Sequence, residues 1–244
     1  MPTAAERRRH YQDFTAEILE LCTDPGVRRD LQDGRGRPVK ECLRMHKYLT
    51  VRTTGHGQRH AHYTVASLIA LADPLEALRT HPTPTPRQTA DERAAQHPPT
   101  APCPPPEAPS STPATPSRTA ADDPAPNLPD APGPGQLDPD PYTAAAWRKR
   151  PNLGGTLARA VRRADFNEDR TDDLLHIIVR VGDDHLHQHL LPSLTDRLLR
   201  AQLAWDWPVL LDDLAARVFD PDQVATRWLD AFYLTLNPIK DQKT

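Results

Sequence analysis

A long proline-rich tract separates this 244-residue chain into two parts that can fold. Nineteen of its 28 prolines lie between Pro82 and Pro141, where large apolar side chains are almost absent. A segment of this composition cannot bury enough apolar surface to offset the entropy lost on ordering, so we predict a disordered, partly polyproline-like linker. The predicted organisation is an N-terminal helical segment over 1–79, the linker over 80–143 and a C-terminal helical bundle over 144–244.

Apolar residues on both sides of the linker recur at helical spacing. Before the linker, the pattern predicts a long helix that ends at Asp24, a short one through Leu31, and helices over 37–49 and 62–72. Beyond the linker, helices are predicted to start at or near Leu153, Thr171, Asp184, Trp207 and Asp220. The sequence has no convincing alternating strand pair or hairpin turn. We therefore predict an all-α fold, a helical bundle in two segments joined by the linker.

The formal net charge of −3 at pH 7 hides two locally basic regions. Residues 80–141 contain three bases and eight acids, whereas residues 1–79 contain thirteen bases and ten acids. Residues 142–244 are near balance, with fourteen bases and fifteen acids. Local clustering matters more for partner binding than the total charge. Because the sequence pI of about 6.4 is low for a free-standing DNA-binding domain, we do not expect a repressor that searches for DNA alone.

Basic side chains gather in two clusters. Between Arg28 and Arg59 the chain has nine bases against three acids, and within it three bases follow at helical i, i+4 and i+7 spacing. The second cluster opens the C-terminal segment, where six bases from Arg148 onward precede the first acid, Asp165. Its last three arginines share the helix side opposite the apolar residues that follow Leu153.

Basic side chains spaced at intervals can contact successive phosphates of a nucleic-acid backbone. Recognition of base edges would also need side chains such as Asn or Gln. The alternative is a solubilising surface, and charge alone does not decide between the two. Because no recognition-helix motif with Asn or Gln beside arginine is visible, we expect contact that is independent of nucleic-acid sequence. The residues predicted to bind nucleic acid are Arg28, Arg29, Arg35, Arg37, Lys40, Arg44, Lys47, Arg159, Arg162 and Arg163.

Catalytic and metal-binding patterns are not found in the sequence. Histidines cluster at His56, His60 and His62 and again in "DDHLHQHL", but alternate residues on a helix point about 200° apart and cannot converge on one ion. In the second cluster only His185 and His189, at i and i+4, would share a face, and His56 and His60 have the same spacing if that stretch is helical. No glutamate completes a zinc-protease arrangement. No phosphate-binding loop or activated nucleophile motif occurs. We therefore expect no enzyme activity, no metal and no cofactor.

The three cysteines and the hydropathy predict the compartment. Cys22, Cys42 and Cys103 form no CxxC pair, and an odd count without a signal peptide indicates a reducing cytoplasm. No apolar run approaches the roughly 20 residues that a bilayer span requires. We expect a soluble, cytoplasmic protein without a membrane partner.

The order of several motifs resembles a known family. "DPGVRRDLQDGRGRPVKECLRMHKYL" and "HYTVASLIAL" precede the linker, and "NLGGTLARAVRR", "LLHIIVRVGDDHLHQHLLPSL", "WPVLLDDLA" and "QVATRWLDAFY" follow it. In this order and spacing they resemble the small-subunit (CasB) family of the type I-E CRISPR Cascade complex. The resemblance covers most of residues 10–79 and 150–235, and the roughly sixty-residue linker departs from the shorter connection expected there.

The resemblance implies a non-enzymatic, all-helical subunit of an antiviral surveillance complex. Its implied partners are the other Cascade subunits, the guide RNA, a second copy of itself, and the target and displaced DNA strands of the R-loop. The alternative is a helical scaffold that recruits a partner through its proline-rich tract. Deletion of residues 82–141 separates the two, because assembly and DNA binding survive only under the Cascade interpretation.

Overall fold

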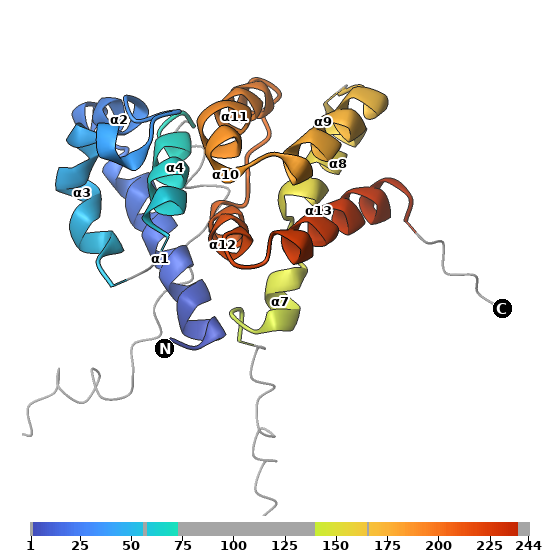
Figure 1. Ribbon diagram of the computed structural model, residues 1–244, viewed down its shortest axis with the longest axis horizontal. Coiled ribbons are helices and arrows are strands. Elements are labelled where there is room, and N and C mark those ends of the chain that lie inside the picture. Colours follow the sequence, from blue (N-terminus) through green and yellow to red (C-terminus); the bar gives the residue numbers. More distant parts are fainter. Residues whose placement is uncertain (1, 56–57, 73–139, 165, 239–244) are drawn as a thin grey trace, which may run out of the picture. The chain divides into compact units, whose positions relative to one another are not determined.

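The computed structural model describes residues 2–55, 58–72, 140–164 and 166–238, and every regular element in these ranges is helical (Figure 1). The predicted all-α fold is confirmed. Residues 80–139 of the predicted linker lie outside the described residues. Its last residues, 140–143, form a turn that contacts the first helix, because the Arg8 guanidinium donates to the Tyr142 carbonyl at 3.0 Å.

In the described chain before residue 73, the first two helices have clear start signals. The helical elements of this part are α1 (Ala4–Leu21), α2 (Pro25–Gln32), the 3-10 turn η1 (Val39–Glu41), α3 (Leu43–Thr53) and α4 (Arg59–Ile69). Helix α1 starts in a capping box, in which Thr3 and Glu6 each accept the other's backbone amide. Helix α2 starts at the predicted break, because the Asp24 carboxylate accepts two amides of its first turn.

The described chain after the proline-rich tract is also helical. Its helical elements are α7 (Ala144–Arg148), α8 (Leu153–Arg163), α9 (Glu168–Arg180), α10 (Asp183–His185), the π-helix η2 (Leu186–Leu190), α11 (Leu191–Arg200), α12 (Trp207–Arg217) and α13 (Pro221–Leu236). Three of the predicted starts, at Leu153, Trp207 and Asp220, agree with these bounds, Asp220 being the N-cap of α13. The start near Thr171 moves to Glu168, because the Asn167 side chain caps α9.

The helix predicted over 37–49 is interrupted. Cys42 leaves the helical region of backbone conformation, with φ −83° and ψ 48°, so a 3-10 turn precedes α3. The interruption rotates the two pieces relative to each other. Met45 and Leu49 of α3 are therefore buried, whereas Leu43 at the start of α3 is 76% exposed.

The helix predicted from Asp184 contains a π-helical segment, and Pro192 gives the physical reason. Proline has no amide hydrogen, so the Gln188 carbonyl one turn earlier loses its usual helical donor. Gly36, at φ +70°, packs against this carbonyl, and a Cβ at Gly36 would lie 2.6 Å from the Gln188 oxygen. The turn after α2 therefore packs closely against the π-helix.

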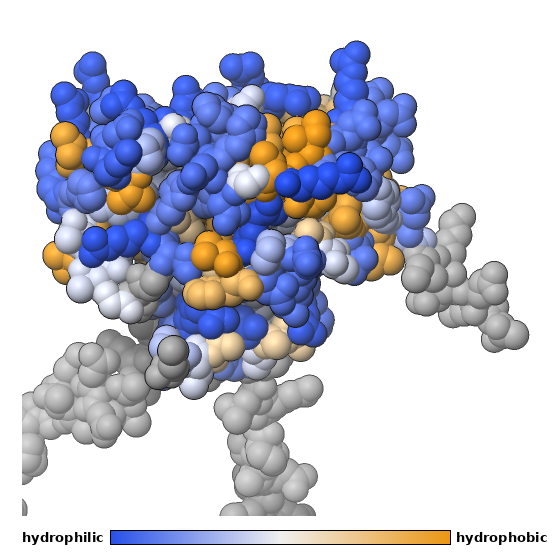
Figure 2. All heavy atoms as spheres, viewed as in Figure 1, coloured by the Kyte–Doolittle hydropathy of each residue, from blue (hydrophilic) through white to orange (hydrophobic). Residues whose placement is uncertain are grey.

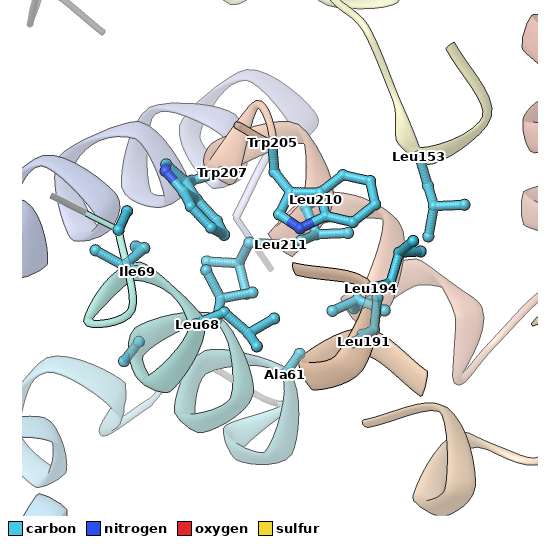
Figure 3. Close-up of a cluster of buried hydrophobic side chains, with 14 of the residues drawn as sticks. Ala61, Leu68, Ile69, Leu153, Leu191, Leu194, Trp205, Trp207, Leu210 and Leu211 are labelled. Atoms are coloured by element: carbon cyan, nitrogen blue, oxygen red, sulfur yellow. The ribbon is translucent and has the colours of Figure 1, made fainter. Parts of the chain in front are cut away.

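Described residues from both sides of the proline-rich tract belong to one compact unit and share a hydrophobic core. Figure 3 shows Leu68 of α4, Leu191 of α11 and Leu211 of α12 in one cluster, with Trp205 and Trp207 beside them. The Trp205 indole donates to the Thr195 hydroxyl at 2.8 Å, so its polar edge is satisfied inside the core.

Helix α8 lies against α13 at very short range. A Cβ at Gly154 would lie 1.8 Å from the Trp228 carbonyl oxygen, so only glycine permits this approach. The Asn152 side chain caps α8 by accepting the Gly155 amide at 2.9 Å, and it donates to the Arg227 carbonyl at 3.1 Å. The motif "NLGG" is therefore a helix start that is closely packed on α13, and it fixes the position of the arginines farther along α8.

Candidate nucleic-acid interface

The ten predicted residues lie on two separate surfaces. Seven of them, on α2, the turn that follows it, η1 and α3, form what we call the α2–α3 surface: Arg28, Arg29, Arg35, Arg37, Lys40, Arg44 and Lys47. The other three form the α8 surface: Arg159, Arg162 and Arg163. In Figure 1, α2 and α3 lie on the left of the folded unit and α8 on the right, with α4, α11 and α12 between them. The structure therefore does not join the two clusters into one continuous patch.

Three of the ten cations are exposed and unpaired within the described part of the chain. The side chains of Arg29, Lys40 and Arg163 make no hydrogen bond or ion pair with any described residue. Arg29 also lines an open hollow at the turn between α1 and α2, together with Arg28. An unpaired exposed cation can approach a phosphate without first breaking an internal contact. These three residues are the best placed of the ten for that contact.

Two other arginines satisfy helix ends. Arg28 Nε and Nη2 donate to the carbonyls of Ala70 and Ala72, both at 2.9 Å, at the end of α4. Arg162 Nη1 donates to the Thr235 carbonyl in the last turn of α13, at 3.2 Å. The last carbonyls of a helix have no partner within it, and a cation there also interacts favourably with the helix dipole. Both arginines therefore stabilise the fold, whatever else they contact.

Arg35 and Arg37 form surface ion pairs. Arg35 Nη1 donates to both carboxylate oxygens of Asp196 on α11, at 2.8 and 3.1 Å. Arg37 lies 3.5 Å from Asp33, one helical turn away. Exposed pairs of this kind contribute about 0–1 kcal/mol and weaken with salt, so they hold these arginines only loosely.

Arg44 and Lys47 share one acidic partner. Lys47 Nζ lies 2.8 Å from Asp30 Oδ2, and Arg44 Nη1 lies 3.7 Å from Asp30 Oδ1. The Tyr48 hydroxyl also donates to Asp30, at 3.1 Å. The hydrogen bond from Lys47, helped by the one from Tyr48 and by the nearby positive charges, holds the pKa of the Asp30 carboxyl below its usual value.

Arg159 is half-buried, unlike its two neighbours on the α8 surface. Its guanidinium donates to the Thr156 hydroxyl at 3.3 Å. Burial lowers the pKa of Arg159, and the positive charge of Arg163 lowers it further. The α8 surface therefore has one unpaired arginine, Arg163, beside one that caps α13 and one that is partly covered.

The second basic cluster of the sequence includes one base that is not available at the surface, and the predicted set omits several exposed bases. Arg150, counted in the second cluster, turns inward and forms a two-point pair with Asp206 at 2.6 and 2.8 Å. Burial of this kind has no signal in a run of charges. Exposed bases outside the predicted set, and unpaired within the described residues, are Arg59, Arg148, Lys149, Arg170, Arg180 and Arg200.

The histidines serve packing in this structure. His187 stacks on His60 with ring centroids 4.2 Å apart, and its Nδ1 lies 2.8 Å from the Thr64 hydroxyl. His185 and His189 do share a face, with centroids 4.9 Å apart. Across the described ranges, no three His, Cys, Asp or Glu side chains are grouped so that they could hold a metal ion. His56 lies outside these ranges.

A buried acid joins α12 to α13. Asp213 accepts from the Trp228 indole at 2.6 Å and pairs with Arg227. Burial raises the pKa of Asp213 to about 7, although the attraction of Arg227 opposes this rise. The carboxyl is 1% exposed, so we assign it to the packing of the two helices rather than to chemistry on a ligand.

Two solved structures have the same fold as this chain. One is a chain of a CRISPR RNA-guided surveillance complex described as pre-nicking, which is 22% identical, with a TM-score of 0.60 and coverage of 94% of both chains. The other is a chain of a CRISPR RNA-guided surveillance complex, 24% identical, with a TM-score of 0.59 and coverage of 94% of this chain and 95% of that one. The matched chains come from the class of complex that the sequence resemblance indicates.

No family profile matches the sequence, and no curated protein matches it. Within the described ranges, no helix has the combination of length and hydropathy needed to cross a bilayer.

Proposed function

We propose that this chain is the non-catalytic small subunit of a type I-E CRISPR Cascade complex. The observation that carries the proposal is the extent of the structural match, 94% of this chain and 94–95% of the matched chains. A match of that extent concerns the whole arrangement of helices rather than one common helical pair. The order of sequence motifs on both sides of the proline-rich tract supports the same assignment.

In this proposal the subunit holds DNA by its exposed cations. Opening a duplex to pair one strand with a guide RNA is nearly balanced in free energy, so backbone contacts can tip the equilibrium. The unpaired side chains of Arg29, Lys40 and Arg163 can supply such contacts to the target or displaced strand. These contacts are independent of sequence and sensitive to salt.

The distribution of charge supports a role inside a larger assembly. The net charge is −3, and most of the predicted cations already have an internal partner. We therefore expect weak binding of free nucleic acid by the isolated chain. In the complex, the other subunits and the guide RNA bring the DNA close, and this subunit, with a second copy of itself, only adds contacts along the strand.

The proposed role involves no covalent chemistry. Two groups with strongly shifted pKa values, Asp213 and His187, are both buried and both hydrogen-bonded to neighbouring helices. They stabilise packing between helices. The exposed cations contact the sugar-phosphate backbone, a task that requires charge and position only.

Co-purification tests the assignment directly. The tagged chain is expressed with the other subunits and the guide RNA of a type I-E complex encoded with it, and the assembly is isolated through a different subunit. We expect the chain in the purified ribonucleoprotein at a fixed stoichiometry that survives gel filtration. Absence of the chain from an otherwise complete ribonucleoprotein would contradict the proposed function.

A further inference from the structure

Three donor groups of α3 converge on one carboxylate of α2. Asp30 receives the Lys47 ammonium at 2.8 Å, the Tyr48 hydroxyl at 3.1 Å and, at 3.7 Å, the Arg44 guanidinium. An ammonium, a guanidinium and a hydroxyl around one anionic group are the donors that proteins use for phosphate oxygens. On the α2–α3 surface, this donor set is already occupied by an acid of the chain itself.

The exposure of the side chains shows which part of the cluster a ligand can reach. The side chains of Arg44 and Lys47 are 65% and 59% exposed, whereas that of Asp30 is 18% exposed. Lys47 also lies over the Tyr48 ring, 4.6 Å from its centroid, which helps to fix the ammonium in place. The cations thus form the outer layer of the cluster and the carboxylate its inner layer.

The other acid pairs on this surface differ from this arrangement. Asp33 and Asp196 each neutralise one arginine, and their side chains are 46% and 33% exposed. Asp30 is more covered than either and holds two cations at once. Its removal would therefore release two positive charges at one place, which no other acid of the α2–α3 surface would do.

We propose that Asp30 takes the place of a nucleic-acid phosphate on the α2–α3 surface and withholds Lys47 and Arg44 from DNA until it is displaced. This inference rests on the proposed function and adds a regulatory residue to it. Lys40, exposed and unpaired within the described chain, precedes these cations in η1 and offers a first contact that does not require displacement. Contact by Arg44 and Lys47 then requires exchange of the Asp30 carboxylate for a phosphate.

This exchange predicts that the effect of Lys47→Gln on DNA affinity depends on whether Asp30 is present. In the wild-type chain, Lys47→Gln removes a cation that is already neutralised, so we expect a change in DNA affinity of less than about twofold. In an Asp30→Asn background the same substitution removes a free cation, and we expect a larger loss. Asp30→Asn alone should raise the affinity by about two- to thirtyfold, the range expected for two released surface cations.

The test measures binding of a fluorescein-labelled, mixed-sequence single-stranded oligonucleotide to the full chain by anisotropy, from low to physiological salt. The variants are Asp30→Asn, Lys47→Gln, the double variant, and Arg29→Gln/Lys40→Gln. Glu41→Gln is the matched control, because it removes an exposed acid from the same surface that forms no ion pair with a described residue. Thermal unfolding of each variant confirms that the fold is retained.

Each outcome decides the inference. The inference is supported if Asp30→Asn binds the oligonucleotide more tightly than Glu41→Gln does. Its plot of log K against log salt concentration should then be steeper by about 0.7 per released cation. If the wild-type chain binds and Arg29→Gln/Lys40→Gln weakens the binding, but Asp30→Asn behaves like Glu41→Gln or binds less tightly, the inference is overturned and the proposed function stands. If neither the wild-type chain nor Asp30→Asn binds at the lowest salt, the DNA-holding part of the proposed function is contradicted, and the inference with it.

Discussion

Arg28 and Arg29 are neighbours on α2, but their guanidinium groups have different roles. Arg28 caps the end of α4, whereas Arg29 is exposed and has no described partner. Adjacent residues on a helix point about 100° apart, and the carbonyls that Arg28 reaches lie more than 40 residues farther along the chain. A run of charges in the sequence therefore predicts where cations gather but not which of them are available to a ligand.

His187 is the residue whose titration should affect stability most clearly. It is 3% exposed, and it is packed between His60 and Thr64. Burial, together with the nearby positive charges of His60 and Arg217, lowers its pKa to about 3. Because an unfolded histidine titrates near 6.5, the unfolded state binds more protons than the folded state between these two values. The contribution of His187 to stability is therefore complete above pH 6.5 and is lost as the pH falls toward 3.

Replacement of His187 by glutamine should remove this dependence on pH. We expect the free energy of unfolding of the wild-type chain, measured relative to His187→Gln, to fall by about 2 kcal/mol between pH 7 and pH 5. Urea unfolding of both proteins at several pH values measures it. Parallel pH profiles for the two proteins would show that His187 titrates normally in the fold.

At the scale of the element, the close contact between α8 and α13 depends on Gly154, which has no side chain. Gly154→Ala would put a Cβ within 1.8 Å of the Trp228 carbonyl, so the two helices must move apart. We expect a loss of about 1–3 kcal/mol in the free energy of unfolding. Urea unfolding measures the change.

Gly155→Ala is the matched control for this prediction. Its added Cβ would meet its nearest atom, Asn152 Oδ1, at 3.6 Å, which is an ordinary contact. Alanine is also the better helix former by about 0.5–1 kcal/mol, so this variant should be as stable as the wild type or more so. Equal destabilisation by both substitutions would mean that the close approach of α8 and α13 is not what restricts position 154.

The sequence predicts helices well where a local signal marks their ends. The break predicted at Asp24 and the helix starts predicted at Leu153 and Asp220 agree with the structure. The interruption at Cys42 and the π-helix before Pro192 were not predicted. Both depend on contacts with other elements: Cys42 packs under the turn at Gly34, and the freed Gln188 carbonyl is covered by Gly36.

At the scale of the whole molecule, the sequence predicts the helical class but not how the two parts of the chain meet. Periodicity indicates which side of each helix is apolar and leaves open which helix covers it. In the structure, α1 and α4 pack on α12, so the core is shared across the proline-rich tract. The candidate site shows the same limit, since the two basic clusters predicted from the sequence lie on different sides of the folded unit.

The surface of the folded unit combines hydrophilic and apolar areas. The face seen in Figure 2 is largely hydrophilic but is interrupted by apolar patches. Among the described residues, Val51 and Phe219 are 84% and 80% exposed. Val51 lies on α3 with Arg44 and Lys47, so this helix exposes both apolar and basic side chains.

The lifetime of the R-loop in a reconstituted complex tests the central claim most directly. Three complexes are compared, carrying the wild-type chain, Arg29→Gln/Lys40→Gln, or Arg35→Gln/Arg37→Gln, which removes the same charge from the same surface but from paired cations. Each is loaded on target duplex and followed as the displaced strand re-anneals. At about 0.2–1 kcal/mol for each exposed contact, we expect the R-loop with Arg29→Gln/Lys40→Gln to be about two- to thirtyfold shorter-lived, and the Arg35→Gln/Arg37→Gln complex to change less. An unchanged lifetime in the first variant, with the subunit still assembled, would contradict the claim that these unpaired cations hold the DNA.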